Sequence, residues 1–231
     1  MKETNPLTLA QKLESLLFGS RRLFHNARID LKYGAFLGGT IKSSYAHLGI
    51  QDVANTDYAV LPFIFKDKVR ESDVLVDIGC GKGRVINWWL SCGLPNQIIG
   101  IELDEAVARR TQQRLRRYEN VKIICGDALN HLPENATVLY LYNPFTAPWV
   151  AKLKDRLKVV YAAAHKITLL YYNCIFVEIF VNDPNWTVEV ISLGAPFHPL
   201  AVVRFRNESS IECESSELRT DCRSASSLSR D

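Results

Sequence analysis

The sequence lacks the features that would mark several other classes of protein. No apolar run approaches the ~20 residues that a membrane-spanning helix needs. The apolar stretch Leu16, Leu17 and Phe18 is too short for the core of a signal peptide. The six cysteines form no Cys-x-x-Cys pair and no metal-ligand spacing with histidine. We therefore expect an intracellular, cytoplasmic protein with free thiols, no membrane partner and no metal.

A strong charge bias is also missing. The 231 residues carry a formal net charge of +3, which favours no nucleic-acid partner and excludes none. One predicted helix, residues 105–118, is crowded with arginines, and we expect it on the outside of the fold with these side chains in solvent. The alternative is a surface for nucleic acid or an acidic protein. The arginines are Arg109, Arg110, Arg114, Arg116 and Arg117.

What the sequence does contain is a glycine-rich turn between a strand and a helix. Residues 74–78 form an apolar, largely β-branched run, which is typical of a strand buried on both faces. Gly79, Gly81 and Gly83 follow, and a helical apolar pattern begins after them. This order predicts the first unit of a nucleotide-binding α/β fold, with Asp77 at the ligand-binding end of the strand.

Strands and helices then alternate along the chain. The order predicts a mostly parallel α/β sheet, closed by an antiparallel hairpin. The predicted strands are residues 97–101, 121–124, 137–142, 167–172, 187–193 and 200–205, and the predicted helices are residues 58–65, 105–118, 148–164 and a short turn at 174–180.

The two ends of the chain differ from this central part. The leader predicts one helix that starts at Asn5-Pro6 and stops at Gly19, a second helix over residues 22–29, and a loop over residues 33–40. The leader is either a packing arm or a cap over a cofactor or substrate. The Ser-rich, acidic end cannot bury enough apolar surface to order itself. The expected parts are a leader over residues 1–54, a catalytic domain over 55–206 and a disordered tail over 207–231.

Polar side chains follow the predicted parallel strands where each one ends. Asp77 and the N–H groups of the turn suit the ammonium and carboxylate of an amino acid. Glu102, at the end of the next strand, suits both hydroxyls of a ribose. Asp127 can accept from the amino group of an adenine, and the alternative is an N-cap for the following turn. The fourth strand ends in Asn143, Pro144 and Phe145, where an amide oxygen beside an apolar ring suits a polar substrate atom.

Together these segments resemble the class I S-adenosylmethionine-dependent methyltransferases, over about residues 55–206. The resemblance implies a Rossmann-like three-layer sandwich with a mixed seven-stranded sheet in the order 3-2-1-4-5-7-6, the last strand antiparallel. It implies S-adenosylmethionine as the cofactor. The implied cofactor contacts are Thr56, Tyr58, Asp77, Gly79, Cys80, Gly81, Gly83, Glu102, Leu103, Asp127, Ala128 and Asn143, and the implied catalytic segment is Asn143, Pro144 and Phe145.

The chain departs from one pattern of that family. Nucleic-acid enzymes that methylate amino groups usually carry two prolines in the fourth motif, and here Phe145 follows Pro144 directly. This argues against adenine N6 or glutamine as the acceptor. The segment with Thr56 and Tyr58 is closer to small bacterial methyltransferases of unassigned substrate and, more distantly, to lysine methyltransferases of this fold.

Methyl transfer from a sulfonium needs positioning and water exclusion more than acid–base groups. We expect in-line displacement to an unidentified acceptor, with a small molecule or a protein amine favoured, and we nominate no general base. Two alternatives stay open. A nicotinamide-dependent oxidoreductase would have its third glycine at position 84, where Arg84 stands. A non-catalytic relative would use the pocket for binding alone.

Overall fold

A computed structural model describes residues 8–40, 42, 55–142, 145–161 and 167–206. The predicted tail, and Asn143 and Pro144 of the predicted catalytic segment, lie outside the described residues. The described chain contains a seven-stranded sheet in the order β3-β2-β1-β4-β5-β7-β6. The strands are β1 (Val74–Ile78), β2 (Gln97–Glu102), β3 (Val121–Cys125), β4 (Val138–Tyr142), β5 (Thr168–Tyr172), β6 (Trp186–Ile191) and β7 (Leu200–Phe205).

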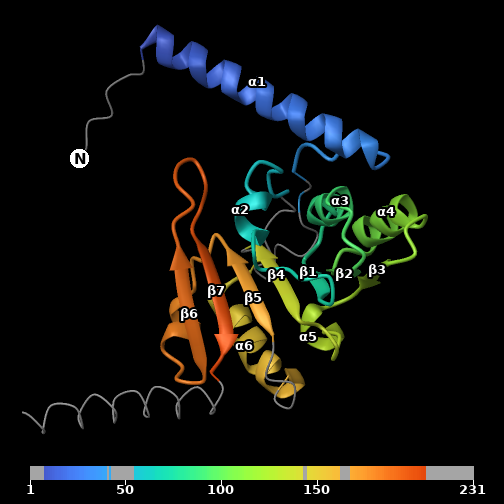
Figure 1. The fold of residues 1–231 in the computed structure, drawn as a ribbon, viewed down its shortest axis with the longest axis vertical. Helices are drawn as coiled ribbons and strands as arrows, with labels where there is room; N and C mark the ends of the chain where they lie inside the picture. Colours follow the sequence, from blue (N-terminus) through green and yellow to red (C-terminus); the bar gives the residue numbers. More distant parts are fainter. Residues whose placement is uncertain (1–7, 41, 43–54, 143–144, 162–166, 207–231) are drawn as a thin grey trace, which may run out of the picture.

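The pairing of the strands confirms the predicted mixed sheet. Strands β1 to β5 pair in parallel with one another, and β7 is antiparallel to both β5 and β6. Strand order reverses between β1 and β4, which both lie at the centre (Figure 1). In such sheets ligands bind outside the carboxyl ends of the strands at this switch point. The fold therefore places the glycine-rich turn after β1 where a nucleotide would bind.

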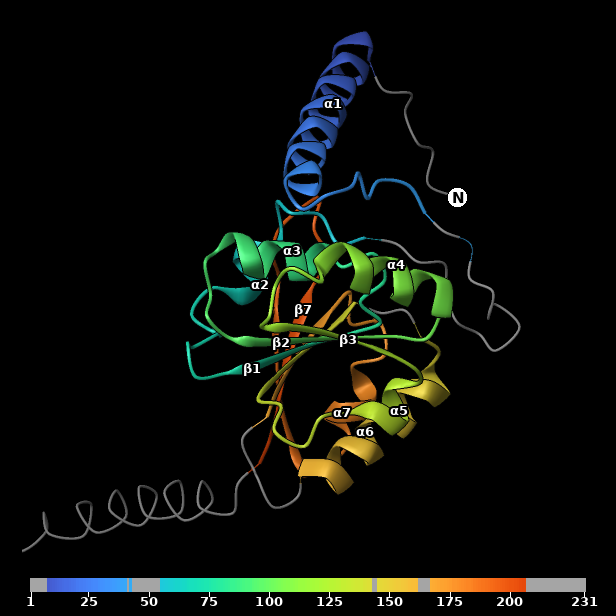
Figure 2. The same cartoon turned by 90° about the vertical axis from the view of Figure 1, so that its right-hand side faces the viewer.

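Two layers of helices cover the two faces of the sheet (Figure 2). One face buries an apolar cluster that contains Trp89, Phe65 and Tyr140, and the other buries a cluster that contains Phe180 and Tyr161. Among the described residues, no helix is both long and apolar enough to span a membrane. The helices are α1 (Leu9–Lys32), α2 (Leu61–Phe65), α3 (Arg84–Ser91), α4 (Glu105–Leu115), α5 (Ala128–His131), α6 (Ala147–Tyr161) and α7 (Glu178–Val181).

The leader differs from the prediction of two helices. One helix of 24 residues, α1, runs through Gly19 and ends at Lys32. A glycine inside a helix costs only about 1 kcal/mol relative to alanine, and contacts elsewhere on the helix offset that cost. The predicted stop at Gly19 was therefore wrong, whereas the loop after α1 was predicted correctly. In Figure 1, α1 lies across the end of the molecule near α2 and α3.

Candidate cofactor site

The turn after β1 depends on its glycines. Gly79, Gly81 and Gly83 all have positive φ, at 72°, 51° and 77°. A Cβ on Gly83 would lie 3.0 Å from side-chain atoms of both Thr111 and Arg114 of α4, so a larger residue would push the turn away from that helix. These glycines let the backbone fold tightly between β1 and the start of α3.

Hydrogen bonds fix the turn to the end of β2. The N–H groups of Gly79 and Cys80 donate to the carbonyl oxygen of Ile101, at 2.8 and 2.9 Å. The N–H of Gly81 donates to Oε2 of Glu102 at 2.8 Å, and the N–H of Asp104 donates to Oε1 of the same carboxylate at 2.8 Å. Glu102 is buried, and it joins the turn to the loop after β2 through one side chain.

Asp77 lies beside this carboxylate, and none of the described residues is its partner. It is 3% exposed, and within the described part of the chain no hydrogen bond or ion pair reaches its carboxyl group. Burial, and secondly the negative charge of Glu102, raise the pKa of Asp77 to about 8. A buried carboxyl group in this state strongly favours a cationic ligand, because the cation would stabilise its charged form.

The end of β3 carries the third predicted acidic residue. Oδ1 of Asp127 accepts from the N–H of Leu129 at 3.0 Å and so caps the short helix α5. The sequence left this N-cap open as the alternative to adenine binding. Among the described residues, no hydrogen bond reaches Oδ2 of Asp127, so this oxygen could still accept one from a ligand. Ala128 is buried against the apolar cluster on the α5–α6 face. Leu103 follows Glu102 in the loop that Asp104 closes.

Cys80 and Thr56 line the inner side of this region. Burial raises the pKa of the Cys80 thiol, whose sulfur faces Gly100 so closely that a Cβ there would lie 2.7 Å away. The hydroxyl groups of Thr56 and Tyr140 lie 2.8 Å apart, and Tyr140 is the neighbour of Asp77 across the β1–β4 pair. A neutral, buried thiol is unsuited to nucleophilic chemistry, so this side of the site is a packing surface.

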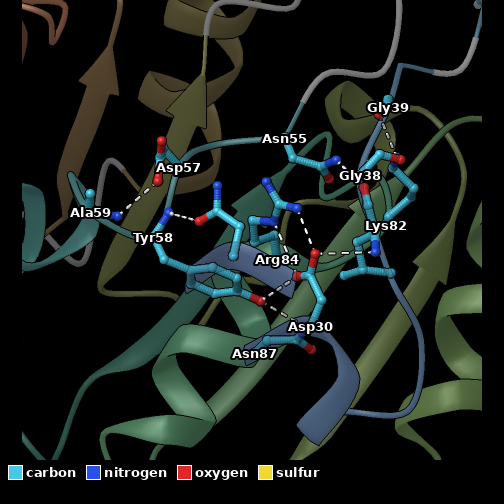
Figure 3. A network of polar contacts seen from close by, with 12 residues as sticks. Asp30, Gly38, Gly39, Asn55, Asp57, Tyr58, Ala59, Lys82, Arg84 and Asn87 are labelled. Carbon is cyan, nitrogen blue, oxygen red and sulfur yellow. Dashed lines mark hydrogen bonds and ion pairs between the residues drawn. The ribbon is translucent and has the colours of Figure 1, made fainter. Parts of the chain in front are cut away.

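Tyr58 faces a different set of partners (Figure 3). Its hydroxyl donates to Oδ1 of Asp30 at 2.9 Å and accepts from Nδ2 of Asn87 at 3.1 Å. Asp30 belongs to α1, and its carboxylate also forms a bidentate pair with Arg84, at 3.2 and 2.6 Å. Because these contacts occupy the Tyr58 hydroxyl, Tyr58 fixes the leader to α3, and its contact with a cofactor stays a prediction.

The leader is attached to the domain through one face of α1. Arg22, Asn26 and Asp30, each four residues apart, face the domain. Arg22 forms an ion pair with Asp57, and Oδ1 of Asn26 accepts from the N–H of Tyr58 at 3.3 Å. We call Asp30, Arg84, Tyr58, Asn87 and Arg114 the clamp.

Arg114 of the clamp and the neighbouring Lys82 also contact the loop after α1. Nζ of Lys82 donates to the carbonyl oxygens of Gly38 and Gly39, at 3.0 and 2.6 Å. Arg114 donates to the carbonyl oxygens of Tyr33 and Lys82, at 2.8 and 2.7 Å. The leader thus packs directly on the outer side of the glycine-rich turn. The prediction of solvated side chains was wrong for Arg114, which is half-buried. Arg84, next to the turn, is buried.

Comparison with known proteins decides the family. Residues 75–165 match the family model of a methyltransferase domain. This part of the chain is a class I, S-adenosylmethionine-dependent methyltransferase domain. No curated protein sequence gives a significant match to the chain.

Solved structures share the fold of the methyltransferase at low sequence identity. An RNA methyltransferase from Salinibacter ruber, in complex with S-adenosyl-L-homocysteine, is 20% identical over 67% of this chain and 95% of its own, with a TM-score of 0.51. A putative caffeoyl-CoA O-methyltransferase from Staphylococcus aureus is 13% identical over 84% and 100%, with a TM-score of 0.54. A tRNA methyltransferase from B. subtilis is 10% identical over 65% and 67%, with a TM-score of 0.51. At these identities the likeness is one of fold.

The methyltransferase has an aromatic cluster next to the predicted cofactor contacts, in which Tyr142 is half-buried and Tyr172 is buried. Tyr142 ends β4 directly before Asn143, and its ring centroid lies 5.2 Å from that of Tyr172 at the end of β5. The ring of His198 lies 5.7 Å from Tyr172, whose hydroxyl accepts from the N–H of His198 at 3.2 Å. Phe145, 8% exposed, stacks on Trp149 at 3.4 Å between centroids and so faces the α6 layer.

Sequence reasoning identified the acidic strand ends but missed the clamp and the aromatic cluster. The sequence did carry a signal for the attachment of α1. Arg22, Asn26 and Asp30 are spaced four residues apart, which places three polar side chains on one face of a helix. A partner for that face was not visible in the sequence. The tyrosines were assigned to strands, and their position at the carboxyl ends of β4 and β5 follows from the strand register.

Proposed function

We propose that this methyltransferase holds S-adenosylmethionine across the carboxyl ends of β1 to β4 and transfers its methyl group by in-line displacement. The observation that carries this proposal is the carboxyl group of Asp77, which is buried beside the glycine-rich turn and has no partner in the described part of the chain. Asp77 would bind the ammonium group of the cofactor. The cofactor carboxylate would use the N–H groups at the start of α3, where the N-cap residue is Gly83 and no side chain caps the helix.

Glu102 would hold the ribose. Each of its carboxylate oxygens already accepts one backbone N–H, and each has a second lone pair for a ribose hydroxyl. Oδ2 of Asp127 would accept from the adenine amino group, with Leu103 and Ala128 beside the ring. Thr56, Gly79, Cys80 and Gly81 would complete the walls of the site.

The bound cofactor supplies a methyl group on a sulfonium, which is its own leaving group. We assign Asn143, Pro144 and Phe145 to the position of that methyl group, because Asn143 follows Tyr142 directly at the end of β4. The chain would orient the acceptor and exclude water, and these effects supply most of the rate. Tyr142 is half-buried and directly precedes Asn143, and its ring would suit an amine on a small molecule or a protein.

The division of the chain into parts belongs to the same proposal. We propose a catalytic domain over residues 55–206 and a leader over residues 1–54 that acts as a packing arm for the cofactor turn. Arg84, which occupies the position of a third dinucleotide-binding glycine, is used to hold this leader. The match to a methyltransferase family model favours the methyltransferase over a nicotinamide-dependent oxidoreductase.

The experiment compares two alanine variants by cofactor binding and by turnover. Glu102→Ala should weaken S-adenosylhomocysteine binding by ~1.5–3 kcal/mol, the scale of a charged hydrogen bond. Asn143→Ala should lower turnover and leave that affinity nearly unchanged. S-adenosylhomocysteine should raise the thermal midpoint of the wild type, and NAD should not.

If Asn143→Ala loses cofactor binding while Glu102→Ala retains it, this placement of the site is wrong. Binding without turnover on any acceptor class would favour the non-catalytic relative.

A further inference from the structure

A cavity lies on the outer side of the glycine-rich turn, between the loop after α1 and helix α4. Its volume is about 400 Å³, within the range of small-molecule sites. The chemical character of its walls is mixed, with cationic, amide, hydroxyl and apolar side chains. The lining residues are Gly34, Ala35, Phe36, Leu37, Lys82, Val107, Arg110, Thr111, Gln113 and Arg114.

The charges at this cavity are all of one sign. Lys82, Arg110 and Arg114 line it, and no carboxylate is among its described lining residues. Asp30, which supplies the carboxylate of the clamp, is already paired with Arg84. Burial lowers the pKa of both Lys82 and Arg114, and the positive charge of Arg84 lowers that of Lys82 further. An anion in the cavity would relieve this excess of positive charge.

The cations also keep unused hydrogen-bond donors. Nζ of Lys82 donates to two carbonyl oxygens, which leaves one of its N–H groups. Nη1 of Arg114 donates to Tyr33 and Asn87, and Nη2 donates to Lys82, so the Nε–H and one Nη2 N–H have no acceptor within the described part of the chain. Arg110 is exposed and has no ion-pair partner among the described residues.

The remaining walls suit an apolar or planar group. Leu37 and Val107 are buried side chains, and Phe36 is 52% exposed, so its ring can cover a bound molecule. We propose that this cavity binds a small organic anion, with its anionic group on Arg110, Lys82 and Arg114 and a planar body against Phe36 and Val107. This site is separate from the cofactor site, and the proposal does not depend on the identity of the methyl acceptor.

The same residues connect the cavity to the cofactor turn. Oγ1 of Thr111 donates to the carbonyl oxygen of Gly81 at 2.9 Å, and Arg114 donates to that of Lys82. A ligand that draws these side chains toward itself changes the contacts that hold the turn. Binding of the anion and of the cofactor should therefore be coupled, and the coupling must be reciprocal.

The test uses phenyl phosphate as the probe, titrated into the full chain saturated with S-adenosylhomocysteine and followed by calorimetry. Phenol lacks the anion, and inorganic phosphate lacks the ring, so both should bind more weakly than phenyl phosphate. Arg110→Gln should raise the dissociation constant of phenyl phosphate about tenfold, as expected for a lost charged hydrogen bond. The matched control, Arg109→Gln, changes the neighbouring exposed arginine, which does not line the cavity, and should leave the constant unchanged.

Several results would overturn the proposal. Absence of phenyl phosphate binding to the wild type would remove the site. Equal binding to Arg110→Gln and the wild type would place the probe elsewhere. Competition between phenyl phosphate and S-adenosylhomocysteine would show that the cavity belongs to the cofactor site. A change in S-adenosylhomocysteine affinity of twofold or more that reaches a limit at saturating phenyl phosphate would support the coupling, whereas in competition the apparent affinity keeps falling as phenyl phosphate is added. An unchanged affinity would exclude the coupling. Because cofactor binding is measured separately, failure here leaves the methyltransferase proposal intact.

Discussion

Asp30 and Asp77 are both buried carboxyl groups on the α3 side of the sheet, and their surroundings differ completely. Asp30 is 0% exposed and has Arg84, the Tyr58 hydroxyl and the N–H of Leu37 as partners. Asp77 is 3% exposed and has no partner among the described residues. A carboxyl group whose partners all come from the chain stabilises the fold. One that is buried without them is destabilising until a ligand supplies the counter-charge.

Loss of the Asp30 charge should give the largest effect on stability. Asp30→Asn leaves Arg84 buried without its counter-charge, and we expect the free energy of unfolding to fall by about 3–5 kcal/mol. Urea denaturation measures this change. The double variant Asp30→Leu with Arg84→Met removes both charges and should recover part of the loss. A decrease below about 1 kcal/mol for Asp30→Asn would show that the clamp contributes little to the fold.

Loss of the Asp77 carboxylate should act mainly on ligand binding. We expect Asp77→Ala to weaken S-adenosylhomocysteine binding by ~1.5–3 kcal/mol in calorimetry, because the ammonium loses its charged partner. Asp183→Asn is a matched control, since that carboxylate pairs with Lys154 and Lys158 on the opposite helical layer. The control should lower the thermal midpoint and leave the affinity unchanged. If both variants bind equally well, Asp77 is not a cofactor ligand.

The buried Asp77 carboxyl group should also make stability and cofactor affinity depend on pH. Burial raises the pKa of Asp77 to about 8, well above its usual range. Between about pH 4 and pH 8 the folded, unliganded protein holds a proton that the unfolded chain releases, so its stability should fall as the pH rises through this window. Cofactor affinity should rise over the upper part of this window and level off above about pH 8, because the ammonium prefers the ionised carboxylate.

The control for this prediction is Asp77→Asn, which cannot ionise. In this variant, stability and cofactor affinity should both change less with pH. Thermal unfolding measures the first and calorimetry the second, at matched pH values. Should Asp77→Asn retain the slope of the wild type, another group governs the pH dependence.

The smallest effect should come from the surface of α4. Arg109 and Glu105 form an exposed pair, at 75% and 63% side-chain exposure. Arg109→Ala should change the free energy of unfolding by less than about 0.5 kcal/mol, since water screens such pairs. Arg114→Ala, on the same helix, removes contacts to the turn and should cost clearly more. Equal losses of unfolding free energy in the two variants would show that the clamp contributes no more to stability than the exposed surface of α4.

The sequence was sufficient for the parts of the fold that rest on local signals. The glycines after β1, the apolar strands and the antiparallel hairpin β6–β7 were all predicted within a few residues, because strand length, turn residues and periodicity are local properties. The seven-stranded order came from the family resemblance, and the structure confirms it. The carboxylates Asp77 and Glu102 were found because acidic residues at strand ends lie at one edge of a parallel sheet.

The clamp could not be predicted, for a physical reason. Asp30 and Arg84 are 54 residues apart in the sequence, and neither residue carries a local sign of its partner. Arg84 next to a glycine-rich turn has the same local sequence whether it faces solvent, a ligand or a leader helix. Gly19 was misread for a related reason, since long-range contacts of α1 decide whether a helix continues through a glycine.

The attachment of α1 through Arg22, Asn26 and Asp30 makes this interaction a matter of helical phase. Each added residue rotates the preceding part of a helix by about 100°. One residue inserted between Asn26 and Asp30 would therefore turn Arg22 away from Asp57 while Asp30 kept its hold on Arg84. Seven inserted residues, close to two full turns, would restore the angle but shift Arg22 along the axis by about 10 Å. The leader should thus tolerate substitutions on its outer face far better than a change in length between Arg22 and Asp30.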